Sequence, residues 1–280
     1  MGYQITEKHL ERFRAYLYEE ERSGGTTEKY LRDIQALRVF LHGKPVCKEC
    51  VIAWKEHLVS LNYSVSTINS MLVAANGFFA FMGWEECRVK PLKRQRQIFR
   101  DRERELSRSE YMRLLSAAKK GGNRRLLLVM QTICSTGIRV SELQYITAEA
   151  VATGKAVVRC KGKIRTVLIP QQLCHLLKQW IKEEQIGAGP IFVTRNGRPL
   201  DRSNICHDMK KLCGSAGVDS RKVFPHNLRH LFAQTFYSLD KDLSKLADVL
   251  GHASVETTRI YIMETGVNHE KLVSQLGLVI

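Results

Sequence analysis

The chain has 280 residues, of which 44% are hydrophobic, and 44 Lys and Arg against 28 Asp and Glu give it a net charge of +16. This length can bury a core in one or two domains, and no apolar stretch approaches the roughly 20 residues that cross a bilayer. The start of the chain lacks the apolar core of a signal peptide, so we expect a soluble, cytoplasmic protein that does not bind membranes. The charge favours a polyanionic partner such as nucleic acid.

Residues 1–90 are predicted to form a helical domain without strands. Leu10, Phe13 and Leu17 lie at helical spacing in the first amphipathic segment. Gly24 and Gly25 are expected to end that helix. Segments 47–62 and 67–84 are equally helical in pattern, and four short helices with brief connections predict a compact bundle.

Residues 91–105 are predicted to be a basic linker, since Pro91 interrupts any helix across the segment. A run of cations is usually a solvated surface, and a linker of this kind is also suited to binding phosphates. The cations that we expect to touch nucleic acid here are Lys90, Lys93, Arg94, Arg96 and Arg100.

Residues 106–280 are predicted to form a second domain of mixed structure. Ser107 and Glu110 have the spacing of a capping box at the start of a helix. Residues 155–169 have the pattern of two short strands around a Lys-Gly-Lys turn, and most of the remainder is helical. The predicted fold class is therefore mainly α, with a small antiparallel β-sheet in the second domain.

Arg139 and Glu142 lie three residues apart at the expected start of a helix, where such residues meet. Taken alone, the spacing favours an ordinary helix salt bridge, which contributes little when exposed. The alternative is an arginine that a carboxylate aims at a phosphate.

His226 and Arg229 have the same spacing, with Pro225 where helices often begin. His226 and His230 have metal-ligand spacing, but no carboxylate cluster accompanies them. The closely spaced Cys47 and Cys50 likewise lack a second pair, and a reducing compartment would keep the thiols free. We predict no metal site.

A third segment, LGHASVETTRIYI, places Tyr261 nine residues after His252 in a polar context. Together with GIRVSEL and FPHNLRHLFA it resembles the tyrosine recombinase, or phage integrase, family. The order and separation of the three segments match that family across residues 105–265, and the N-terminal bundle resembles the family's core-binding domain. The resemblance implies a two-domain clamp on duplex DNA.

The resemblance also implies the role of each residue. Arg139, Arg229, His226 and His252 would surround the scissile phosphate, and Tyr261 would be the nucleophile. His226 would be the general base and Lys161, in the hairpin turn, the general acid, with Lys163 as its rival. His252 would donate to a phosphate oxygen, and Glu142 would hold Arg139.

The implied reaction cuts and rejoins DNA through a covalent 3′-phosphotyrosyl bond, as in integration, excision, inversion or resolution. Phosphoryl transfer needs positioning and charge neutralisation, which two guanidiniums can supply, so we expect no metal, ATP or other cofactor. The expected partners are DNA with short inverted repeats and three further copies in a Xer-type tetramer, contacted through the apolar C-terminal tail. The alternatives are a catalytically silent DNA-binding regulator and a type IB topoisomerase.

Overall fold

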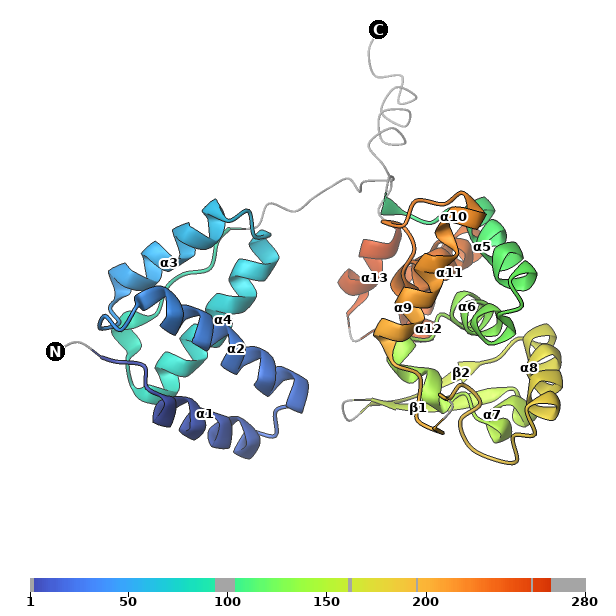
Figure 1. Ribbon diagram of the computed structural model, residues 1–280, viewed down its shortest axis with the longest axis horizontal. Coiled ribbons are helices and arrows are strands. Elements are labelled where there is room, and N and C mark those ends of the chain that lie inside the picture. The colour runs from blue at the N-terminus through green and yellow to red at the C-terminus, as the bar shows by residue number, and fades with distance from the viewer. Residues whose placement is uncertain (1–2, 94–103, 161–162, 195, 253, 263–280) are drawn as a thin grey trace, which may run out of the picture. The chain divides into compact units, whose positions relative to one another are not determined.

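The computed structural model describes residues 3–93, 104–160, 163–194, 196–252 and 254–262, except the side chains of residues 160, 163 and 262. The chain divides into two compact units, residues 1–96 and 97–280 (Figure 1). The boundary between these units falls within the segment 91–105 that was predicted to be a linker. Both units are built mainly from helices.

The first unit is a bundle of helices: α1 (Glu7–Glu19), α2 (Gly24–Leu41), α3 (Lys48–Ser60) and α4 (Val65–Met82), followed by the 3₁₀ turn η1 (Glu85–Cys87). Each of the four α-helices begins after a side chain that accepts a hydrogen bond from an N–H of the first turn. These capping residues are Thr6, Ser23, Cys47 and Ser64. Because Ser23 caps α2, Gly24 and Gly25 are the first residues of that helix and do not end α1, contrary to the sequence prediction.

Aromatic and aliphatic side chains fill the centre of the first unit. Phe78 of α4 is fully buried and meets the edges of Phe13 and Trp84, with ring centroids 5.3 and 5.6 Å apart. By length and composition α4 could cross a membrane, the one such helix among the described residues. It packs against α2 and α3, however, and Ile68 and Leu72 are buried with Phe78 in the same core. Its apolar character therefore serves the bundle.

The second unit combines helices with one two-stranded sheet. β1 (Lys155–Cys160) pairs antiparallel with β2 (Lys163–Leu168), and Lys155 lies opposite Leu168. The predicted capping box at Ser107 and Glu110 is present at the start of α5. The helices are α5 (Arg108–Lys120), α6 (Arg124–Thr136), η3 (Val140–Tyr145), α7 (Ala148–Thr153), α8 (Gln171–Glu183), α9 (Arg202–Lys211), α10 (Cys213–Ala216), α11 (Pro225–Asp240), α12 (Leu243–Leu250) and α13 (Val255–Ile262).

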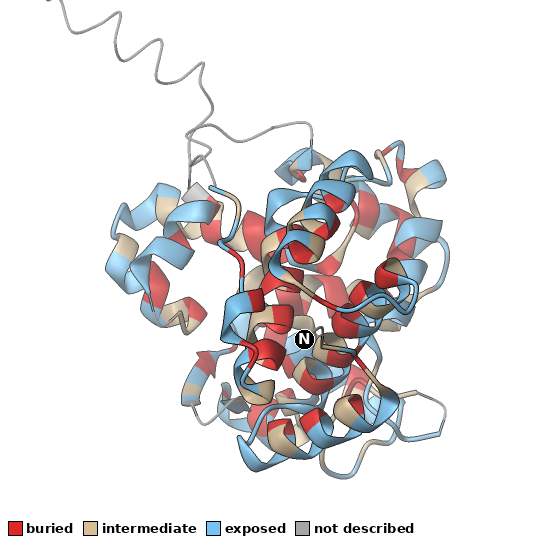
Figure 2. Ribbon diagram, turned by 90° about the vertical axis from the view of Figure 1, so that its left-hand side faces the viewer, coloured by how far each residue is buried: buried red, intermediate tan, exposed pale blue. Residues whose placement is uncertain are grey.

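Helix α6 supplies much of the core of the second unit, and α11 packs along it. Leu128, Met130 and Ile133 of α6 are fully or almost fully buried, and Figure 2 shows buried positions in red on the inward sides of the helices. Helix α11 also contacts α12 and α13. It thereby brings the three segments that the sequence singled out into one region of the unit.

Candidate active site

Arg139, which is partly exposed, meets the buried carboxylate of Glu142 at the start of η3. Arg139 is the N-cap of this 3₁₀ helix, and its backbone N–H donates to Oε2 of Glu142 over 2.9 Å. Its Nη1 donates to Oε1 of the same carboxylate, also over 2.9 Å. Glu142 is only 1% exposed, so the arrangement differs from an ordinary surface salt bridge.

Glu142 has a second cationic partner, because Nη2 of Arg165 donates to its Oε2 over 2.6 Å. Burial raises the pKa of the Glu142 carboxyl. The backbone N–H of Arg139 and the positive charge of Arg165 outweigh that effect and hold the pKa below its ordinary value. The carboxylate is therefore ionised and fixes both arginines.

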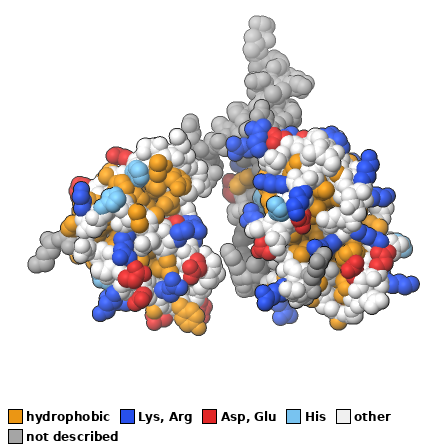
Figure 3. All heavy atoms as spheres, in the orientation of Figure 1, with side chains coloured by type: hydrophobic (Ala, Val, Ile, Leu, Met, Phe, Trp, Pro, Cys, Tyr) orange, Lys and Arg blue, Asp and Glu red, His pale blue; other side chains and the backbone are white. Residues whose placement is uncertain are grey.

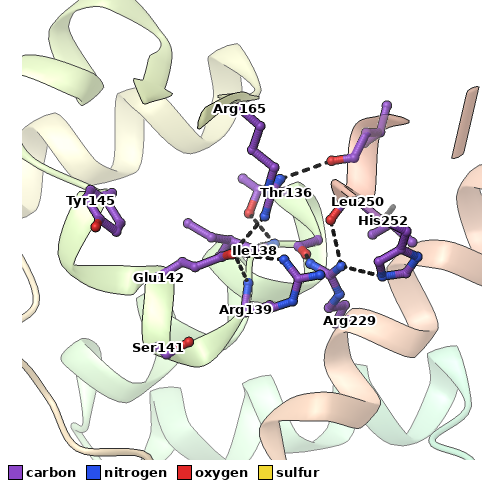
Figure 4. Close-up of polar contacts among 12 residues, drawn as sticks. Thr136, Ile138, Arg139, Ser141, Glu142, Tyr145, Arg165, Arg229, Leu250 and His252 are labelled. Atoms are coloured by element: carbon purple, nitrogen blue, oxygen red, sulfur yellow. Dashed lines mark hydrogen bonds and ion pairs between the residues drawn. The ribbon is translucent and has the colours of Figure 1, made fainter. Parts of the chain in front are cut away.

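Arg229 of α11 is 1% exposed, and three acceptors surround its guanidinium. Nη1 donates to the carbonyl oxygen of Gly137, while Nη2 donates to the carbonyl of Leu250 and to Nε2 of His252, over 2.8 and 2.9 Å. Burial, followed by the charge of Arg139, lowers the pKa of Arg229 to about 10. It stays cationic at neutral pH, and Figure 4 shows it between Arg139 and His252.

Gly137 ends α6 in the left-handed conformation, with φ of 63°. A Cβ at this position would lie 2.5 Å from Cδ1 of Phe232, a distance that no real contact allows. Glycine therefore lets the chain turn tightly against α11. The turn aims the Gly137 carbonyl at Arg229 and starts the segment that carries Arg139.

His252 follows the left-handed Gly251 at the end of α12. Its Nδ1 lies 2.8 Å from the hydroxyl of the fully buried Thr258. Burial, followed by the charges of Arg229, Arg139 and Arg165, lowers the pKa of His252 to about 4, so the ring is neutral near pH 7. Because Nε2 accepts from Arg229, the proton of the neutral ring lies on Nδ1 and is donated to Thr258.

Tyr261 of α13 is 6% exposed and packs among histidines. Its hydroxyl lies 3.4 Å from Nε2 of His226, at the start of α11. Its ring centroid lies 4.1 Å from that of His230 and 5.4 Å from that of His252. A phenol with an imidazole nitrogen beside its oxygen has a group within reach that could accept its proton.

The sequence matches the Phage integrase family over residues 104–266, more than half of the chain. The chain belongs to the phage integrase family. The N-terminal SAM-like domain of phage integrases also matches, over residues 10–86. These two matches confirm the family that the sequence motifs indicated.

Curated relatives of this integrase-family chain are named tyrosine recombinases. XerA of Pyrococcus furiosus is 28% identical over 278 residues, which cover 96% of this chain and 94% of the relative. XerH of Campylobacter jejuni is 33% identical over 177 residues, covering 60% of this chain and 49% of that protein. The names of the relatives confirm the prediction of a DNA strand-transferring enzyme.

Solved structures show the same fold. A lambda integrase fragment (residues 75–356), crystallised as a dimer bound to a COC′ core site, has a TM-score of 0.75 at 17% identity, covering 92% of this chain and 95% of that one. XerH recombinase bound to difH substrate has a TM-score of 0.70 at 19% identity, with 97% and 85% covered. The predicted fold class, mainly α with a small antiparallel sheet, is confirmed.

Five of the predicted site residues of this integrase-family chain come together, although they are far apart in the sequence. They are Arg139, His226, Arg229, His252 and Tyr261. Glu142 joins them through Arg139. Among the described residues, no group of three or more His, Cys, Asp or Glu side chains is placed to hold a metal ion.

Other predicted residues do not join this group or lie outside the described residues. Lys90 and Lys93 are exposed in the first unit. Lys161 lies outside the described residues, and of Lys163 only the backbone is described, paired with Cys160. Arg94, Arg96, Arg100 and the tail 263–280 also lie outside the described residues.

The structure adds residues that motif analysis missed. Arg165 binds Glu142, Thr258 binds His252, and His230 packs on Tyr261. The sequence analysis considered His230 only for its metal-ligand spacing with His226, and it did not single out the other two. The available signal for Thr258 was its place in the segment LGHASVETTRIYI, between His252 and Tyr261.

Proposed function

We propose that this chain is a site-specific DNA recombinase in which Tyr261 cuts one strand and holds the cut end as a 3′-phosphotyrosyl ester. The observation that carries the proposal is the convergence of two guanidiniums, two histidines and one tyrosine from separate segments. The Tyr261 hydroxyl lies 3.4 Å from Nε2 of His226. The ring of Tyr261 stacks on that of His252, which Arg229 binds.

In the proposed reaction, His226 takes the proton of the Tyr261 hydroxyl as its oxygen attacks phosphorus. The bond from phosphorus to the 5′-oxygen then breaks, and a general acid gives that oxygen a proton. We propose Lys161 for the acid, with Lys163 as the rival. Attack by a 5′-hydroxyl on the tyrosyl ester reverses these steps, so rejoining conserves the bond energy.

Arg139 and Arg229 are proposed to bind the non-bridging oxygens of the phosphate. Guanidiniums bind such oxygens through two parallel N–H donors, and one well-placed arginine can accelerate phosphoryl transfer by about 10³- to 10⁵-fold. Arg229 is already fixed by backbone carbonyls, so little reorganisation is needed when the phosphate arrives. Glu142 fixes Arg139 in the same way.

His252 needs a change before it can donate to the phosphate. In the structure its Nε2 accepts a hydrogen bond from Arg229. A phosphate oxygen that takes the place of the imidazole as the partner of Arg229 would free Nε2. The negative charge would also favour a proton on that nitrogen, and His252 could then donate to the phosphate.

Double-stranded DNA with short inverted repeats is the proposed substrate, bound by a tetramer in the cytoplasm. The net charge of +16 supports an anionic partner, and Lys and Arg side chains are spread over the visible face of each unit (Figure 3). Lys90 and Lys93, with Arg94, Arg96 and Arg100, are proposed to contact the DNA backbone. One of the solved relatives, lambda integrase, is a tetramer bound to a Holliday junction, and we propose that the tail 263–280 links subunits.

The test uses nicked duplexes whose sequences flank the gene, mixed with the protein in EDTA without ATP. Cleavage beside the nick releases a short strand, so the covalent product is trapped and is seen on a denaturing gel. Tyr261→Phe should abolish this product, because the nucleophilic oxygen is gone. Tyr237→Phe is the matched control, since Tyr237 is a partly buried tyrosine packed near the same cluster.

A protein–DNA product that survives Tyr261→Phe would contradict the assignment of the nucleophile. DNA binding without any product across the panel would instead indicate a silent binding protein. Relaxation of supercoiled DNA that lacks a specific site would favour a type IB topoisomerase.

A further inference from the structure

Arg165 lies on β2, opposite Val158 of β1, and its guanidinium reaches two other segments. Nη2 donates to Oε2 of Glu142 over 2.6 Å, and Nη1 donates to the carbonyl of Val249 over 3.0 Å. The side chain is only 14% exposed. Figure 4 shows it reaching from the hairpin towards both η3 and the end of α12.

The turn before His252 is built around this side chain. A Cβ at Gly251 would lie 2.2 Å from Cδ and 2.7 Å from Nε of Arg165. Any other residue at position 251 would displace either the turn or Arg165, and φ of 65° also favours glycine there. Gly251 therefore gives Arg165 the room to pass beneath the turn that presents His252.

We infer that Arg165 is a positioning residue, which joins the strand hairpin to Arg139 through Glu142 and to His252 through the turn at Val249 and Gly251. This inference rests on the proposed function, because positioning matters only if Arg139 and His252 face a phosphate. The hydrogen bonds of Arg165 within the described residues go to Glu142 and Val249 and not to Tyr261, so its effect passes through these partners.

A guanidinium is needed for this role. The acceptors on Glu142 and Val249 lie on different elements, and a planar fork of N–H donors binds both at once. An ammonium at the end of a lysine would keep the charge, but its single nitrogen would have to serve both acceptors. The Nε of Arg165 is buried without a partner, a cost that the two charged and polar contacts offset.

The position of Arg165 on the hairpin also relates it to the proposed general acid. Arg165 lies four residues after Lys161, the proposed general acid, on the strand that follows the turn. Anchoring β2 to η3 and to α12 thus fixes the strand that begins at Lys163, close in sequence to Lys161. The same side chain thereby ties this strand to Arg139, through Glu142, and to the turn before His252.

The first test measures single-turnover cleavage of the nicked duplex at saturating DNA. Arg165→Met should lower the rate about 10²-fold, the loss expected from a small misplacement of groups around a reacting centre, without weakening DNA binding comparably. Arg165→Lys should recover only part of the rate. Arg159→Met is the matched control, because this substitution removes the same charge from an exposed position on β1. The Arg159→Met variant should cleave at a rate near that of wild type.

Combination with Glu142→Gln separates positioning from general destabilisation. If Arg165 acts through Glu142, the double variant should lose little more than the worse single variant. Fully multiplicative losses would overturn the inference, as would an Arg165→Met rate equal to that of wild type. Thermal unfolding of each variant identifies any loss that arises from misfolding.

A second readout does not depend on the reaction. Burial lowers the pKa of His252, and the charges of Arg229, Arg139, Arg165 and His226, which face the ring, lower it further. NMR titration of the His252 ring, assigned with His252→Gln, should show a higher pKa in Arg165→Met and no change in Arg159→Met. If wild-type protein forms no DNA adduct, the proposed function fails by itself, and an unchanged His252 titration overturns the role of Arg165 independently.

Discussion

The two units bury different kinds of side chain. Among the described residues, the polar side chains buried in the first unit are Thr27 and Asp33. The second unit buries a larger set that includes two charged residues and a histidine: Thr132, Thr136, Glu142, Asn227, Arg229, His230 and Thr258. Burying charge is costly unless every group is paired. The second unit carries more of this cost than the first, where the buried carboxylate of Asp33 pairs with Lys29.

The two units depend on different kinds of contact for their structure. The first unit is held by apolar contacts such as those of Phe78 with Phe13 and Trp84, which depend on volume and shape. In the second unit, Arg229 and Glu142 need particular partners in particular directions. We attribute the difference to function, since a buried cation with fixed orientation is what a phosphate transition state requires.

The strongest test of the comparison replaces Arg229 with lysine. Arg229→Lys keeps the charge but cannot serve Gly137, Leu250 and His252 together. We expect single-turnover cleavage to fall by about 10³-fold or more, because a guanidinium on the phosphate contributes on that scale. Gel analysis of the covalent product over time measures the rate.

Arg113→Lys is the control for that substitution. Arg113 also bridges two backbone carbonyls, those of Ala216 and Gly217, over 2.9 and 3.1 Å, but it does so away from the site. Its replacement should leave cleavage nearly unchanged. Equal losses in the two variants would mean that Arg229 acts only in folding, and the contrast between the units would lose its functional meaning.

The core of the first unit should respond to a loss of side-chain volume. Phe78→Ala should lower its free energy of unfolding by about 3–5 kcal/mol, the usual effect of emptying an aromatic site in a core. The midpoint of urea unfolding is followed by the fluorescence of Trp54 and Trp84 in a Trp180→Phe background. Val73→Ala, on an exposed position of the same helix, should change stability by less than about 0.5 kcal/mol.

The same comparison explains what could be predicted from the sequence. Helical periodicity located the bundle, and the Ser107 and Glu110 pattern located the start of α5. Spacing also predicted that Arg139 meets Glu142 at the start of a helix. It did not specify that this helix is a 3₁₀ helix. These features are local, so a few neighbouring residues determine them.

Contacts between distant segments were beyond prediction from spacing. Arg165 and Glu142 are 23 residues apart, and Arg229 reaches Gly137 across 92. Such pairs depend on how α6, α11 and the hairpin pack, and no periodic pattern records that packing. Family resemblance supplied the grouping of the site residues, while the hydrogen-bond directions, including the proton on Nδ1 of His252, required the structure.

Acidification should destabilise the second unit, and we expect this effect to be smaller than those of Arg229→Lys and Phe78→Ala. The folded-state pKa of His252 is about 4, whereas the unfolded chain takes up that proton near pH 6.5. The unfolded state therefore binds more protons between these values, and the second unit becomes less stable as pH falls through that window. We expect a loss of about 1–2 kcal/mol, discounted for partial exposure of the ring.

The measurement follows urea unfolding by Trp180 alone, with Trp54 and Trp84 replaced by phenylalanine, from pH 7.5 down to 4.5. The ion pairs of Glu142 stay intact in the folded state over this range, because its pKa is lowered. Its contribution to stability begins to fall only as the pH approaches the ordinary pKa of a glutamate, about 4.3, so Glu142 affects only the acid end of the series. His252→Gln should flatten the profile, since glutamine does not titrate. A wild-type midpoint that stays constant down to pH 4.5 would show that burial and the neighbouring cations do not hold His252 neutral. The contrast in buried charge would then fail, while the contrast in packing would stand.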